Sequence, residues 1–187
     1  MSMTRVLSRN PKRRLGALAS LLVAGAVAVG SGANFTAASA NPSNTFSTGT
    51  LSMINSNSGA AVLTAPAMKP GDSATGTVDI QNSGSITGTF SLAKSNINDS
   101  DATNPLSQEL TVTIADCGLW SGGVAPSCSG ATQKYSGTIA AMGTLALGSF
   151  ASNDKHRYQF TVTLPSGAGD VYQGDSTSVE YDWSAVS

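Results

Sequence analysis

The sequence has few charged residues, one histidine and two cysteines. Charged residues make up 11% of the 187 residues, and aromatic residues 6%. A zinc hydrolase needs at least two His, or His and carboxylate, ligands at a spacing such as H-E-x-x-H, and this chain has only His156. A Ser-His-Asp hydrolase would also have to use His156, which lies in the charged stretch Asp154-Lys155-His156-Arg157 at the start of a predicted strand. We therefore expect no enzyme activity and no cofactor.

The sequence also lacks helical periodicity and internal repeats. Glycine is abundant, at 20 residues, and Ser, Thr and Asn recur throughout. This composition favours strands joined by polar turns over long surface helices. The length suits one domain once an export signal is removed.

The N-terminal third begins with a predicted secretory signal. Five basic residues up to Arg14 precede the apolar stretch 15–30, in which Ser20 is the only polar side chain, and small residues follow. This is the order of a signal peptide, and about 16 apolar residues are short for the ~20 that span a bilayer. The sequence predicts a secreted protein with no stable membrane span after processing.

Two sites compete for the signal peptidase, and they differ in what remains on the mature protein. Cleavage after Ala33 would leave Asn34 as the first residue, whereas cleavage after Ala40 fits the A-x-A rule better. After removal of residues 1–33, five basic residues face eleven acidic ones, a net charge of −6. So acidic a domain is a poor candidate for nucleic-acid binding.

Several segments alternate apolar and polar residues, the pattern of half-buried strands. The alternating segments are 77–81, 89–92, 110–114, 158–164 and 179–184, with weaker candidates at 48–53, 60–63, 133–139 and 144–147. The turn Asn82-Ser83-Gly84-Ser85 predicts a hairpin between the first two. A short helical turn is expected within 96–106. Together these segments predict an all-β, antiparallel two-sheet sandwich of eight or nine strands, a jelly roll or Ig-like Greek key.

Four short motifs add a family resemblance. Phe46-Ser47-Thr48-Gly49-Thr50-Leu51 follows the signal, and Pro70-Gly71-Asp72-Ser73, Asn82-Ser83-Gly84-Ser85-Ile86 and Tyr172-Gln173-Gly174-Asp175-Ser176 come after it. In this order and spacing they resemble the TasA/camelysin family of bacterial exports, which a dedicated signal peptidase processes. The resemblance implies a jelly-roll sandwich at the cell surface. It also favours cleavage at Ala33, because mature members tend to begin just before an aromatic such as Phe35.

Members of that family include fibre proteins of the biofilm matrix, in which the N-terminal segment of one subunit completes a sheet of its neighbour. Others have been described as cell-surface metalloproteases. The two-cysteine loop 117–128 resembles high-GC Gram-positive members more than TasA itself.

Cys117 and Cys128 are predicted to form a disulfide, because thiols oxidise outside the cell and the glycines between them let the chain fold back. Trp120 within the loop is either an exposed contact residue or a lid packed on the sandwich edge. Asn96, Asn98, Asp99 and Asp101 gather oxygen ligands in one predicted loop, but the EF-hand spacing is absent. We expect no metal site there.

The sequence thus divides into a signal peptide (1–33), an N-terminal arm (34–45) and a β-sandwich domain (46–187). The arm could extend ~35 Å at about 3.3 Å per residue, with Phe35, Ala37 and Ser39 on one side for pairing with a sheet edge. Composition alone predicts a disordered tail; the resemblance favours a donor strand.

Our leading expectation is a structural protein of the cell surface or biofilm matrix that forms homo-oligomers or fibres through this arm. An alternative is a monomeric binding or adhesion module that uses the Trp120 loop to contact matrix or cell-wall components. A camelysin-like protease ranks third.

Overall fold

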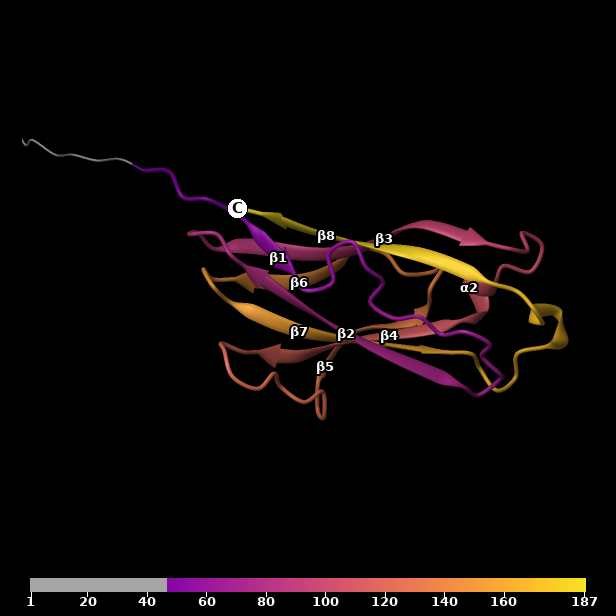
Figure 1. Cartoon of the computed structure of the whole chain (residues 1–187). Coiled ribbons are helices and arrows are strands. Elements are labelled where there is room, and N and C mark those ends of the chain that lie inside the picture. Colours follow the sequence, from indigo (N-terminus) through magenta and orange to yellow (C-terminus); the bar gives the residue numbers. More distant parts are fainter. Residues whose placement is uncertain (1–46) are drawn as a thin grey trace, which may run out of the picture. The chain divides into compact units, whose positions relative to one another are not determined.

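The computed structural model describes residues 47–187, which form a sandwich of two antiparallel sheets (Figure 1). The strands are β1 (Met53–Asn55), β2 (Ser73–Asn82), β3 (Gly88–Asp99), β4 (Thr111–Leu119), β5 (Thr132–Thr138), β6 (Leu145–Phe150), β7 (Lys155–Thr163) and β8 (Thr177–Val186). One sheet has the order β1-β2-β7-β4-β5 and the other β6-β3-β8. The prediction of an all-β two-sheet sandwich is confirmed.

The predicted signal peptide, the cleavage site at Ala33 and Asn34, and the arm with Phe35, Ala37 and Ser39 lie outside the described residues. Within residues 47–187 the helices are α2 (Leu106–Glu109) and the 3₁₀ turn η1 (Asp170–Tyr172). No helix in this part of the chain has the length and apolar character needed to cross a membrane.

The core lies between the sheets and follows the predicted alternation. In β7, Tyr158 and Phe160 are fully buried, whereas Gln159 between them is half-buried on the outer face. The register places Val78 beside Tyr158 and Ile114 beside Phe160, so neighbouring strands point their apolar side chains to the same side. Period-two patterning therefore sets which face of each strand is inside.

The predicted hairpin at residues 82–85 is wrong, because β2 and β3 belong to different sheets. The side chain of Asn82 stabilises the passage of the chain from one sheet to the other. This side chain is fully buried, and its Nδ2 donates to the carbonyl oxygens of Ile86 (2.8 Å) and Phe150 (2.9 Å), while its Oδ1 accepts from the Gly84 N–H (3.0 Å). These bonds replace hairpin pairing and carry the chain from one sheet to the other.

Several further local predictions differ from the structure. The strand expected at 48–53 is displaced to β1, and the helical turn expected within 96–106 is displaced to α2, which begins at Leu106. The strand expected at 60–63 is absent; these residues belong to an irregular connection between β1 and β2. The loop predicted to hold Asn96, Asn98, Asp99 and Asp101 begins only after Asp99, since β3 continues through Asn98 and Asp99, which pair with Ser178 and Thr177 of β8.

Candidate functional site

β8 forms one edge of the three-stranded sheet, and among the described residues it pairs only with β3. Within residues 47–187, no strand pairs with the second edge of β8. Its inward-facing side chains Val179, Tyr181, Trp183 and Ala185 are only half-buried, although they pack against the core. An unpaired edge with a partly covered apolar face is a site where a further strand can add.

A groove of about 1200 Å³ runs beside this edge. One wall is β8 from Thr177 to Trp183, and the other is the connection between β1 and β2. Four core residues line it as well, Leu110, Ile139, Val162 and Leu164, together with the partly buried Leu106. A groove of this volume beside the edge of a strand can hold an extended peptide segment.

Tyr181 and Trp183 make the apolar surface of β8 aromatic. The Trp183 ring lies 5.4 Å from that of Tyr158 and 6.3 Å from that of Phe160, between centroids. The phenol oxygen of Tyr181 is buried and has no hydrogen-bond partner within residues 47–187. Burial raises the pKa of Tyr181 to about 12, so this side chain stays neutral at physiological pH.

The groove is bordered by acidic side chains. They are Asp170, Asp175, Glu180 and Asp182, against the single base Lys69. Such a border disfavours anionic ligands. Residues 34–45 of the sequence contain no charged side chain, so an arm of this composition would meet no repulsion there.

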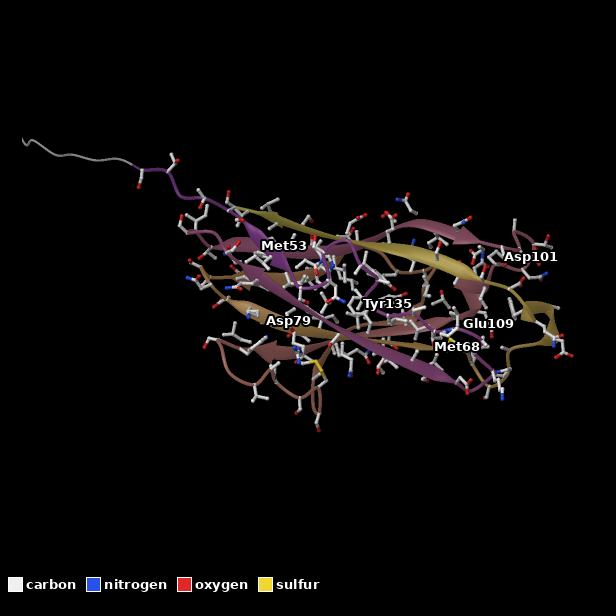
Figure 2. The ribbon with its side chains drawn as sticks, viewed as in Figure 1. Met53, Met68, Asp79, Asp101, Glu109 and Tyr135 are labelled. Atoms are coloured by element: carbon white, nitrogen blue, oxygen red, sulfur yellow. A yellow bond between two sulfur atoms is a disulfide. The ribbon has the colours of Figure 1, made fainter. Side chains whose placement is uncertain are left out.

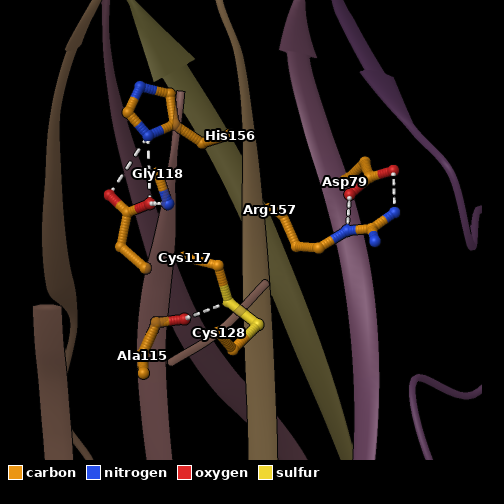
Figure 3. The surroundings of a disulfide bond; sticks show 8 residues. Asp79, Ala115, Cys117, Gly118, Cys128, His156 and Arg157 are labelled. Atoms are coloured by element: carbon orange, nitrogen blue, oxygen red, sulfur yellow. Dashed lines mark hydrogen bonds and ion pairs between the residues drawn. A yellow bond between two sulfur atoms is a disulfide. The ribbon is translucent and has the colours of Figure 1, made fainter. Parts of the chain in front are cut away.

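The predicted disulfide between Cys117 and Cys128 is confirmed (Figure 3). It closes the loop between β4 and β5, and β5 is the edge of the larger sheet farthest in strand order from β1 and β2. The disulfide loop and the groove therefore involve different edges of the sandwich.

Trp120 packs on the sheet rather than extending into solvent. Its backbone N–H donates to the carbonyl oxygen of Lys155 (2.9 Å), and its half-buried ring lies 4.0 Å from Lys155 Nζ and 5.6 Å from Arg157 Cζ, measured to the ring centroid. Arg157 in turn forms a two-bond ion pair with Asp79 at 2.7 and 2.9 Å. This geometry favours the lid interpretation of Trp120 over the contact interpretation.

His156 is hydrogen-bonded to Asp116 and not to a serine. Its Nδ1 is 3.1 Å from both carboxylate oxygens, and within residues 47–187 it has no other hydrogen-bond partner (Figure 3). Burial alone would raise the pKa of Asp116, but hydrogen bonds from His156 and the Gly118 N–H, with the charges of His156 and Lys134, bring it below its ordinary value. The pair stabilises one end of the core and assembles no catalytic triad in the described chain.

The carboxylates considered for calcium have structural partners. Asp99 accepts from the N–H (2.8 Å) and hydroxyl (2.7 Å) of Ser107, and Asp101 accepts from the Thr103 N–H (2.7 Å). Residues 47–187 contain no cluster of three or more His, Cys, Asp or Glu that could hold a metal ion. The oxygen atoms of this region hold the start of α2 and the turn before it.

Comparison with protein-family models and with curated proteins finds no match to this chain. The groove was not foreseen from the sequence, because the alternation in 179–184 predicts a strand but not its neighbours.

Proposed function

We propose that this protein is a secreted structural component of the cell surface or biofilm matrix that assembles into oligomers or fibres by donating its N-terminal arm, residues 34–45, to a neighbouring copy. The proposal includes cleavage after Ala33, kinship with the TasA/camelysin family and no catalytic activity. The two-sheet sandwich is compatible with the jelly roll that this kinship implies.

One observation carries the proposal: β8 offers an unpaired edge beside a groove of peptide size. Strand addition would pair the backbone of the arm with β8 and bury the exposed parts of Tyr181 and Trp183. Main-chain hydrogen bonds supply affinity in this mode, and alternate side chains supply specificity. Phe35, Ala37 and Ser39 would face the groove as one such alternate set.

The position at which the chain enters the domain favours donation of the arm to another copy. The backbone N–H of Thr50 donates to Ser85 Oγ, and Leu51 lies against Gly88. Both contacts are at the end of the sandwich where β8 ends beside Thr89 (Figure 1). An arm of ~35 Å leaving this end could reach another copy.

The test compares the mature chain beginning at Asn34 with a chain lacking residues 34–44. We expect oligomers or filaments from the first, by sedimentation and electron microscopy, and folded monomers from the second. Monomers from both chains would reject the proposal. Ala37→Pro should block assembly because it removes a backbone donor from the arm, whereas Ala37→Ser, the matched control, should assemble.

A second candidate is the adhesion module that contacts matrix or cell-wall components through the disulfide loop. The observation in its favour is exposed apolar surface on that loop, since Val124 is 96% and Leu119 57% exposed. Val124→Asp should then abolish binding to cell walls while the fold persists. Unchanged binding would reject this candidate.

A further inference from the structure

The wall of the groove opposite β8 is an irregular segment, residues 62–68, which we name the strap. Its side chains are attached to the core: Val62, Leu63 and Met68 all pack there (Figure 2 labels Met68). Its backbone is not attached. Among the described residues, no hydrogen bond involves a backbone N–H or C=O of residues 62–68.

The strap residues are half-buried or exposed, so their unpaired backbone groups can bond to water and remain available to a partner strand. The sequence itself predicts a strand at 60–63, which the described fold leaves unformed. Ala67 has φ of 51°, a left-handed conformation that is unfavourable for alanine. The strap is thus held to the core by side chains, without the backbone hydrogen bonds of a strand among the described residues.

Gly76 of β2 provides the space in which the strap lies. A Cβ at this position would overlap the carbonyl oxygen of Val62 and come within 2.8 Å of Leu63 Cβ. Because Gly76 faces the interior, the strap runs over the inner side of β2. The strap and β8 both line the groove, and within residues 47–187 β8 pairs with β3 alone.

Two segments whose backbones have unpaired groups within residues 47–187 therefore line the same groove. Every strap residue and residues Thr177 to Trp183 of β8 contribute to its lining. A strand that pairs with β8 in this groove has a second hydrogen-bonding edge, and the strap is a segment with unpaired backbone groups that lines the same groove. A strand paired on one side only would leave its second edge exposed.

We infer that the strap is the second half of the acceptor: the arm of another copy pairs with β8 on one side and with the strap on the other, and the strap becomes a strand when the arm binds. This inference rests on the proposed strand donation and extends it. The occupant is residues 34–45 of a second copy, whose uncharged side chains suit the acidic border of the groove.

Hydrogen exchange of the assembled and arm-deleted chains tests the inference. We expect the strap amides to exchange freely in the arm-deleted monomer and to become protected at least tenfold on assembly, together with amides on the free edge of β8. Protection of β8 alone would overturn the strap's role and leave strand donation standing. Protection of neither segment in an assembled sample would reject donation to this groove as well.

A pair of strap variants adds a readout that does not depend on exchange. Thr64 is exposed, and its N–H has no partner within residues 47–187, so Thr64→Pro should fold normally in the mature chain. If the strap pairs with the arm, this variant should assemble on the order of tenfold more weakly, since tenfold corresponds to the loss of one backbone bond. Thr64→Ala should assemble like the parent. Equal assembly of folded T64P and T64A would overturn the inference.

Discussion

The imidazole Nδ1 of His156 lies 3.1 Å from both carboxylate oxygens of Asp116, and this contact organises one end of the core. Asp116 is 9% exposed, and Lys134 Nζ approaches its second oxygen at 3.7 Å. The His156 ring stacks on Phe150 of the opposite sheet, with centroids 4.4 Å apart. The pair thus links β4 and β7 of one sheet to β6 of the other.

Asp116→Asn should therefore destabilise the domain at neutral pH. The lowered pKa of Asp116 means that its charged form is favoured by folding, so the stabilisation is present above the ordinary pKa of about 3.9 and is lost as pH falls through the folded value. Replacing a charged hydrogen-bond acceptor by a neutral one should cost about 1 to 3 kcal/mol. Urea unfolding at pH 7 and at pH 3 measures this difference.

The difference between D116N and the parent should shrink at pH 3, where the unfolded chain already protonates the aspartate. Asp170→Asn is the matched control, because Asp170 is exposed on η1 and should change stability little at either pH. A destabilisation of D116N that is as large at pH 3 as at pH 7 would contradict the role of charge.

Loss of the disulfide should lower stability without affecting assembly. The bridge closes a loop with a sequence separation of 11 residues, and the chain-entropy model gives about 2 to 3 kcal/mol for such a loop. Urea unfolding of the Cys117→Ser/Cys128→Ser variant should show this loss. Because the loop does not line the groove, the variant should still assemble, and loss of assembly by a folded variant would indicate a role for the loop.

The local sequence pattern predicts which face of a strand is buried, but not which strand lies beside it. The alternation in β7 and β4 predicts their inward residues correctly because side-chain direction has period two. Pairing depends on contacts between residues far apart in the chain. β2 and β3 are neighbours in sequence and lie in different sheets, and the buried bond from Asn82 to Phe150 that helps to hold this crossover joins residues 68 apart in the chain.

The groove illustrates the same limit. Residues 60–63 and 179–184 both have strand-like sequences, yet only the second forms a strand in the described chain. A strand needs a partner with free backbone groups as well as a suitable sequence. The disulfide was predictable because only two cysteines exist and their loop is short and glycine-rich.

Trp183 should report occupation of the groove. It is half-buried on β8, and Trp120 is the second tryptophan of the chain. In a Trp120→Phe background, assembly should shift the emission of Trp183 to shorter wavelength and reduce its quenching by acrylamide, because the arm would cover the ring. The same variant without residues 34–44 should show neither change. A Trp183→Phe chain that retains Trp120 should also show none, and a change there would mean that assembly uses another surface.

Gly76→Ala should weaken both the fold and assembly, because the strap lies directly over Gly76. The added methyl group meets the backbone of Val62, which cannot rotate away as a flexible side chain would. Overpacking of this kind costs about 1 to 3 kcal/mol. Gly143→Ala is the matched control: nothing lies within 4 Å of its Cβ position, so the substitution should leave stability unchanged or raise it by about 0.4 to 1 kcal/mol. Urea unfolding compares the two, and sedimentation shows whether G76A, with its strap displaced, loses assembly while G143A retains it. A G76A chain as stable as the parent would show that the strap leaves this position at little cost.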